Sequence, residues 1–245
     1  VYFFPREFSL ENYWVILNDS RLLTGYKNTI LRTLIGVPLS LAFTSLVAYA
    51  MSRKELVGRS FFYWANIITL FFSGGLIPYF LVIKSIGLYD NFLVYIIPTM
   101  YSAFNMIVFS SFFRSIPEEV RESALIDGAG EIKIWYKIIL PLSKPVLATV
   151  GLWVTVIHWN SFFDTMIFTI SPELQTLQFY LLTVIRESSM PTSSDVPLPP
   201  ELYRNISPQT VSLAAIVVAT TPILFVYPFL QKHFVKGFMI GSLKG

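Results

Sequence analysis

SIPEEVRESALIDGAGEIKIWYKIILPLSKP, residues 115–145, is the stretch that decides the fold, because it is the one long charged passage between two strongly apolar runs. Its first residues, Ser115 to Glu118, have the S-x-x-E pattern of a capping box, in which a hydroxyl and a carboxylate satisfy free backbone N–H groups at a helix start. Pro117 suits the first turn of such a helix. The sequence therefore predicts that a helix begins here.

Two apolar stripes, separated by glycines, follow this start. The first stripe consists of Ile116, Val120, Ala124 and Leu125, and the second of Ile132, Trp135, Ile138 and Ile139. Their helical spacing gives each helix one apolar face that needs a partner. Between the stripes, Asp127, Gly128 and Gly130 favour a tight turn. Pro141 and Pro145 are expected to end the second helix. The stretch therefore predicts two short helices joined by a glycine corner.

The composition of the 245-residue chain indicates a membrane environment. Hydrophobic residues make up 54% and charged residues 13% of the chain, which is more apolar than soluble domains usually are. The net charge of +3 and the scattered basic residues do not indicate nucleic acid. The chain has no cysteine, so disulfides and thiolate chemistry are excluded. Because it also lacks an H-E-x-x-H pattern, we expect no metal site and no cofactor. Without a phosphate loop the chain does not bind a nucleotide in that way, so any energy from nucleotide hydrolysis must come from a partner.

Five stretches without Asp, Glu, Lys or Arg are long enough to span a hydrocarbon core, which takes about 20 residues. We expect them to be helices, because lipid offers the backbone no hydrogen-bond partners. Prolines inside them should produce kinks rather than breaks. The expected fold is therefore all-α and polytopic. The five spans are 33–52, 60–83, 91–113, 145–163 and 205–231.

The distribution of Lys and Arg gives the orientation. If the hairpin is cytoplasmic, the inner segments are 52–59, 114–144 and 232–245, and they hold more Lys and Arg than the longer outer segments. The chain then divides into an extracytoplasmic segment 1–27, a membrane domain 28–231 and a cytoplasmic tail 232–245. Arg32, at the mouth of the first span, is expected to snorkel towards the surface.

The hairpin also resembles the signature of a known family. Glu122 to Ala124, then Gly128, then the I-x-L-P of Ile138 to Pro141 are similar to the E-A-A, G and I-x-L-P of permease subunits of bacterial ABC importers, although Ser123 replaces the usual alanine. This resemblance implies a type I importer permease fold in which hairpin 115–141 docks on a cytoplasmic ABC ATPase dimer. The residues to which it assigns coupling are Glu122, Ser123, Ala124, Asp127, Gly128, Ile138, Leu140 and Pro141. Among these, Glu122 would meet a basic partner, Ala124 would allow close docking and Gly128 would form the turn.

The rest of the chain is most similar to the second permease of maltose-type importers, which has six helices. YFFPREFSLENYWVILND, residues 2–19, resembles the segment after the first of these helices, so a sixth, N-terminal helix is expected to precede this sequence; a five-span variant is the alternative. FVKGFMIGSLKG, residues 234–245, resembles the family's closing segment, which in some relatives reaches the ATPase dimer. The resemblance also implies a second, homologous permease subunit and an extracytoplasmic solute-binding protein.

The expected outer loop, residues 168–206, is the least typical of the family. Its apolar part, 176–185, is too short to span and should lie at the interface or fold back against the bundle. The proline-rich remainder, 186–204, should be extended. We hypothesise that it contacts the solute-binding protein; a flexible, solvated loop is the alternative.

A polar cluster lies near the outer end of the fourth span, in HWNSFFDT. Its members are His158, Trp159, Asn160, Ser161 and Asp164. Amides, hydroxyls and aromatic faces suit neutral sugars, so one interpretation is a substrate pathway. The other is hydrogen bonding between helices. Weaker candidates of the same kind are Asn66, Ser73, Tyr101 and Asn105.

These observations predict a non-enzymatic permease subunit of an ATP-driven importer in the bacterial cytoplasmic membrane, forming half of a pathway for a sugar or oligosaccharide. Two alternatives remain open. The substrate could be an amino acid, osmolyte or anion, or the chain could be a membrane scaffold that carries a cytoplasmic hairpin.

Overall fold

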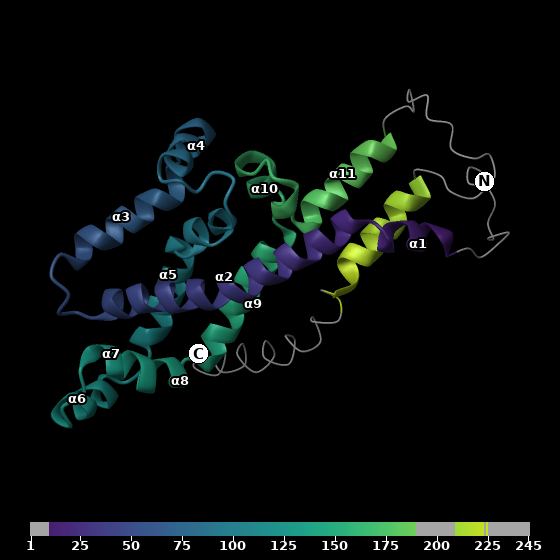
Figure 1. The fold of residues 1–245 in the computed structure, drawn as a ribbon. Helices are drawn as coiled ribbons and strands as arrows, with labels where there is room; N and C mark the ends of the chain where they lie inside the picture. The colour runs from purple at the N-terminus through teal and green to yellow at the C-terminus, as the bar shows by residue number, and fades with distance from the viewer. Residues whose placement is uncertain (1–9, 190–208, 223, 225–245) are drawn as a thin grey trace, which may run out of the picture.

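The structure, a computed structural model, describes residues 10–189, 209–222 and 224, and the elements found in these residues are helical (Figure 1). In chain order they are α1 (Glu11–Leu17), α2 (Ser20–Ser52), α3 (Arg59–Phe71), α4 (Leu76–Ser85), η1 (Phe92–Tyr95), η2 (Ile97–Thr99), α5 (Ala103–Arg114), α6 (Glu118–Ile126), α7 (Glu131–Ile134), η3 (Trp135–Ile139), α8 (Leu140–Leu142), α9 (Lys144–Asn160), α10 (Phe163–Phe168), η4 (Pro172–Leu174) and α11 (Leu177–Ser189). A further helix covers Gln209–Pro222.

The longest element, α2, is the axis against which α5, α9 and α11 pack (Figure 1). It begins at Ser20, where the Asp19 side chain caps it by accepting a hydrogen bond from the Arg21 N–H. Its 33 residues extend about 50 Å at 1.5 Å per residue. The expected boundary between segments 1–27 and 28–231 falls inside this helix, and it stays a prediction because the helix can extend beyond the membrane. Pro38 lies inside α2 without interrupting it.

The second predicted span, 60–83, is wrong as a single helix. α3 and α4 meet at an angle of 117° across a short break. Gly75, immediately before α4, has φ 89° and ψ 172°, a conformation that only glycine adopts readily. Apolarity alone does not reveal such a break, because both arms of the bend are strongly hydrophobic.

The remaining spans also differ from straight helices. Residues 92–114 bend by 44° between the short turns η1 and η2 and helix α5, and the fourth span ends at Asn160, before α10 begins. Of the fifth span, 205–231, only the part near Gln209–Pro222 lies within the described residues. In the described part of the chain, one helix is long and apolar enough to cross a membrane, or up to four spans are present if each bent pair counts as one.

The apolar passage 176–185 folds back against the bundle, which confirms one of its two predicted positions. It forms most of α11, and Leu177, Tyr180 and Val184 are buried there. Gly25 of α2 permits this contact, because a Cβ at that position would lie 3.0 Å from the Leu177 Cα. Most of segment 186–204, and all of tail 232–245, lie outside the described residues, so the predictions made for them stay predictions.

Candidate functional site

The start of α6 differs from the predicted capping box. Pro117 is the residue before the helix, with an extended ψ of 135°, and α6 begins at Glu118. The Ser115 hydroxyl instead donates to the Phe112 carbonyl at 2.7 Å, at the end of α5. The Glu118 carboxylate accepts from Arg53 and Arg121, so it is not available to cap the backbone. The capping-box prediction is therefore wrong, although a helix does follow Pro117.

The glycine corner after α6 is confirmed. Gly128 has φ 76°, the left-handed conformation that favours glycine. The Gly128 N–H donates to the Leu125 carbonyl at 2.9 Å, and the Ala129 N–H donates to the Ala124 carbonyl at 2.9 Å. These two bonds form a Schellman motif, which satisfies the last carbonyls of α6. A Cβ at Gly128 would meet nothing within 4 Å, so the backbone conformation, not space, selects glycine here.

The second helix of the hairpin is one continuous segment. α7, η3 and α8 form one helical segment, Glu131–Leu142, whose middle turn is a π-helix. Pro141 lies near the end of this segment, and the chain turns by 86° at Ser143, immediately before α9 begins. Pro145 lies in the first turn of α9, a position that tolerates a missing N–H. The helix ends at Leu142, between the two prolines, so the prediction that Pro141 and Pro145 end it is confirmed.

The hairpin is fixed to the end of α2 by a network that we call the hairpin anchor: Tyr49, Arg53, Glu118, Arg121 and Glu131. Arg121 pairs with Glu118 at 2.8 Å and also with Glu131. Arg53 pairs with Glu118 at 2.9 Å, and its guanidinium lies 4.8 Å from the Tyr49 ring centroid. The Tyr49 hydroxyl donates to Glu131. Hydrogen bonds from Arg121 hold the pKa of Glu131 below its ordinary value, against the opposing effect of burial.

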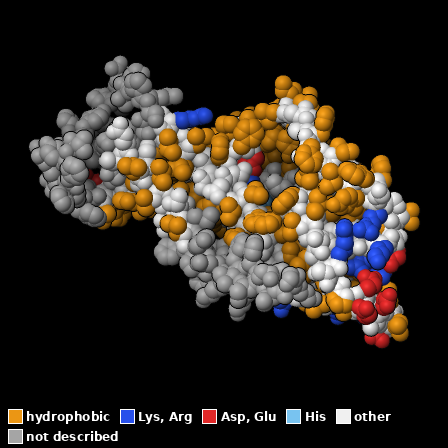
Figure 2. Space-filling model, turned by 180° about the vertical axis from the view of Figure 1, so that it is seen from behind, with side chains coloured by type: hydrophobic (Ala, Val, Ile, Leu, Met, Phe, Trp, Pro, Cys, Tyr) orange, Lys and Arg blue, Asp and Glu red, His pale blue; other side chains and the backbone are white. Residues whose placement is uncertain are grey.

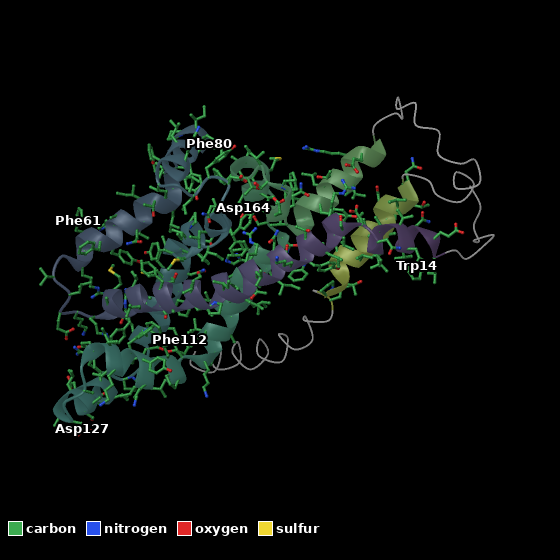
Figure 3. All side chains as sticks on the ribbon, viewed as in Figure 1. Trp14, Phe61, Phe80, Phe112, Asp127 and Asp164 are labelled. Atoms are coloured by element: carbon green, nitrogen blue, oxygen red, sulfur yellow. The ribbon has the colours of Figure 1, made fainter. Side chains whose placement is uncertain are left out.

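The outer surface of the hairpin carries both charged and apolar side chains. Glu122, Ser123 and Asp127 are exposed, and Asp127 lies at the far end of the molecule (Figure 3). Ile126 and Ile132, on either side of the corner, are 86% and 72% exposed. Figure 2 shows acidic and basic side chains gathered over this end, while hydrophobic side chains cover much of the remaining described surface in that view.

The other predicted coupling residues lie further inside. Ala124 is buried in the core cluster that includes Phe113 and Ile139, so its small side chain serves contact within this chain rather than at an outer docking face. Ile138 and Leu140 are half-buried, and Pro141 is exposed. The signature therefore divides into an exposed part around the corner and an inner part that holds the hairpin against α5 and α2.

A second ionic cluster, which we call the Arg32 node, lies further along α2 and comprises Arg32, Tyr95, His158 and Asp164. Arg32 is 1% exposed and binds the Asp164 carboxylate through both terminal nitrogens, at 3.2 and 2.5 Å. Its guanidinium lies 4.6 Å from the Tyr95 ring centroid, and its Nε donates to His158 Nδ1 at 3.4 Å. The prediction that Arg32 snorkels is therefore wrong: it is among the largest fully buried side chains described.

The predicted polar cluster 158–164 is only partly brought together. Ser161 donates to Asp164 at 2.8 Å, so it joins the node. His158 packs so closely on α2 that a Cβ at Gly36 would lie 2.5 Å from its Cε1. Asn160, in contrast, is exposed and donates to the Val156 carbonyl, while Trp159 packs towards the α11 cluster. Hydrogen bonding between helices thus accounts for Asp164 and for Nδ1 of His158, while Ser161 pairs locally with Asp164. The Nε2 of His158 is buried without a hydrogen-bond partner among the described residues. Within the described residues, no three His, Asp or Glu side chains are placed to bind a metal ion.

Comparisons with known proteins agree with this arrangement. The polygalacturonan/rhamnogalacturonan transport system permease protein YtcP of Bacillus subtilis is 39% identical, over 98% of this chain and 84% of that protein. Protein LplC of the same organism is 40% identical, over 100% of this chain and 82% of its own length. A chain from the crystal structure of a bacterial ABC transporter that imports the acidic polysaccharide alginate superposes with a TM-score of 0.84, at 35% identity, over 94% of this chain and 81% of that one. Residues 27–240 match the family described as binding-protein-dependent transport system inner membrane component, and the chain therefore belongs to this family.

Proposed function

We propose that this chain is a permease subunit of an ATP-driven ABC importer for oligosaccharides, and that its hairpin transmits the motion of a cytoplasmic ATPase dimer to the membrane helices. The observation that carries the proposal is the projecting hairpin: its tip exposes apolar side chains, and its base is tied to the longest helix of the fold (Figure 1). ATP hydrolysis belongs to the partner, and the subunit itself performs no covalent chemistry.

The hairpin tip has the chemistry of a docking surface. Two isoleucine side chains are exposed to solvent at the tip, and burying one such side chain against a partner is favourable by about 1.5–3 kcal/mol. Ile126 and Ile132 would supply this apolar contact, while the exposed carboxylates of Glu122 and Asp127 would meet basic groups around it. A partner with an apolar groove bordered by Lys or Arg fits this surface.

The hairpin anchor provides the mechanical connection to the membrane domain. Arg121 and Glu131 come from the two helices of the hairpin, and Tyr49 and Arg53 come from the end of α2. A displacement of the tip therefore acts on α2 through several polar contacts at once. Because α2 packs on α5, α9 and α11, its movement would shift the whole bundle.

The other partners follow from the exposed faces and from the relatives. α3 has no buried residue, and Phe61, Trp64 and Phe71 are 73%, 61% and 86% exposed, so this arm would contact lipid or a second, homologous permease. The names of YtcP and of the maltodextrin permease MdxG describe oligosaccharide or polysaccharide transport. By this analogy, a solute-binding protein delivers a carbohydrate to a multi-pass permease pair in the bacterial cell membrane.

Copurification of the ATPase tests the docking surface. Ile126→Asp places a charge in the proposed apolar contact, whereas Val57→Asp changes an 89%-exposed residue in the connection between α2 and α3. We expect Ile126→Asp to lower the amount of ATPase recovered with the permease about tenfold or more, corresponding to a loss of about 1.4 kcal/mol. Val57→Asp should retain it. Equal recovery of ATPase with both variants would overturn the proposed role of the hairpin.

A further inference from the structure

Two neighbouring cavities lie at the hairpin end of α2. The first, which we call the apolar cavity, has a volume of about 620 Å³ and lies between α2, α3 and the hairpin, with Val47, Ala50 and Phe62 in its wall. The second, which we call the charged cavity, has a volume of about 660 Å³ and lies between the α2–α3 connection and the start of the hairpin. Arg53 and Glu55 line both, so one ligand with two chemically different parts can occupy them together. Both volumes fall within the range of about 300–1,000 Å³ that small-molecule sites occupy.

The polar side chains that border the apolar cavity already have partners. Those of the hairpin anchor pair with one another, and Glu55 lies 3.8 Å from Arg121. Asn66 donates to the Phe62 carbonyl and accepts from the Tyr101 hydroxyl. The rest of the lining is apolar. A hydrocarbon chain therefore fits this cavity, because it would leave no polar group newly unpaired.

The charged cavity holds more unpaired positive than unpaired negative charge. Lys54, Arg59 and Arg114 line it at the ends of α2, α3 and α5, and none of them has an ion-pair partner among the described residues. In the same part of the chain, Glu119 and Glu122 of α6 are the two lining carboxylates that also lack one. Three cations at the ends of membrane helices therefore face two carboxylates on the hairpin. This excess of positive charge suits an anionic head group.

The position of the cavities relative to the membrane selects the occupant. The α2–α3 connection lies at the same end of the molecule as the hairpin (Figure 1), and this end faces the cytoplasm in the proposed function. Val57 and Phe61, on either side of Arg59, are 89% and 73% exposed, so the cations lie beside a surface that suits lipid. A soluble anion would leave the apolar cavity empty, and an apolar helix of a neighbouring subunit would leave the cations unpaired.

We propose that the two cavities form a binding site for one anionic phospholipid of the inner leaflet. Its phosphate pairs with Lys54, Arg59 and Arg114, and one acyl chain lies in the apolar cavity between α2 and α3. Because residues of the hairpin anchor line this cavity, the bound lipid would lie against the contacts that hold the hairpin on α2.

Native mass spectrometry of the complete, detergent-purified importer, titrated with dioleoylphosphatidylglycerol, tests the head-group contacts. We expect the double variant Lys54→Gln with Arg59→Gln to bind this lipid about thirtyfold more weakly, the factor that corresponds to about 1 kcal/mol for each basic residue near a membrane surface. Lys133→Gln with Lys137→Gln is the matched control, because both lysines are exposed, lie on the hairpin and line neither cavity. It removes the same charge and should retain the wild-type affinity. The same spectra show whether each variant assembles.

A second variant tests the acyl-chain contact. Ala50→Phe places a ring in the apolar cavity and should weaken binding about tenfold, which corresponds to two methylene groups of the chain kept out of the cavity. Ala42→Phe, an equally exposed position of α2 that lines neither cavity, is its matched control and should bind like the wild type.

Three results would overturn the lipid site. The first is an absence of bound phospholipid in the wild-type importer, as expected if a neighbouring subunit fills the cavities. The second is equal affinity for dioleoylphosphatidylcholine, which carries no net charge, and the third is displacement of the lipid by millimolar inorganic phosphate, which would assign a site for a free anion. The titration requires neither ATP hydrolysis nor transport, so each of these results would leave the proposed function intact.

Discussion

The two ionic clusters on α2 differ in how far they are withdrawn from solvent. In the hairpin anchor, the side chains of Glu118 and Glu131 remain 48% and 46% exposed, while those of their partners Arg53 and Arg121 are 11% and 12% exposed. In the Arg32 node, the side chains of Arg32 and Asp164 are 1% and 18% exposed. An exposed charge is solvated with or without its partner, so its ion pair contributes little to stability. A buried charge that loses its partner is strongly destabilising.

The difference matters because one helix carries both clusters. Between Arg32 and Tyr49, α2 rises about 25 Å. At the node, α2 is joined to α10 through Asp164, to α9 through His158 and to η1 through Tyr95. This joint resists separation. The anchor, whose carboxylates remain in contact with water, suits the end of the helix that would follow the proposed ATPase partner.

The largest expected effect is at the node. Asp164→Ala leaves the Arg32 guanidinium buried without its carboxylate, which should lower the free energy of unfolding by about 3–5 kcal/mol. Unfolding of the detergent-purified protein by denaturant measures this loss. The double variant Arg32→Met with Asp164→Ala should recover most of it, because no buried charge then remains. If the two variants were equally unstable, the comparison between a buried and an exposed cluster would fail.

A smaller effect is expected at the glycine corner. Gly128→Val must adopt φ 76°, which costs about 1–2 kcal/mol for a residue with a Cβ. Since nothing lies within 4 Å of a Cβ there, Gly128→Asn has the same space but a side chain that tolerates this conformation, and it is the matched control. We expect an importer that carries Gly128→Val to hydrolyse ATP with little sugar transport, or to lose its ATPase, while one that carries Gly128→Asn transports sugar.

Transport and ATPase activity in the same proteoliposomes separate these outcomes. Full coupling in Gly128→Val would contradict the assignment of the corner. Coupling lost equally in both Gly128 variants would show that the side chain itself, not the backbone conformation, disturbs the docking surface.

The sequence predicted the corner but not the node, and the physical reason is distance along the chain. Gly128 forms its hydrogen bonds with residues a few positions away, so the local motif contains the necessary information. Arg32 and Asp164 are 132 positions apart, and each resembles an ordinary charge near the end of a span. The signal available in the sequence was an arginine at an apolar span with no Asp or Glu nearby, since a charge inside the membrane requires a partner elsewhere in the fold. The bend before Gly75 was missed because hydropathy does not report backbone conformation.

The smallest expected effect is at the hairpin anchor and depends on pH. Glu131→Gln should lower the free energy of unfolding by only about 0.5–1 kcal/mol at pH 7, because the carboxylate is half exposed. Arg121 lowers the pKa of Glu131 in the folded state, so its contribution is complete above the ordinary value of 4.5 and is lost as the pH falls further. The difference between wild type and Glu131→Gln should therefore disappear at low pH.

Glu119→Gln, an exposed change on α6, is the matched control and should leave the pH profile unchanged. Denaturant unfolding at several pH values between 7 and 3 gives the free energy of unfolding of each variant as a function of pH. If Glu131→Gln lowered the free energy of unfolding by the same amount at every pH in this range, the side chain would contribute through packing rather than charge. The anchor would then resemble the Arg32 node, and a hairpin held so rigidly would not adjust to the movement of the proposed ATPase partner.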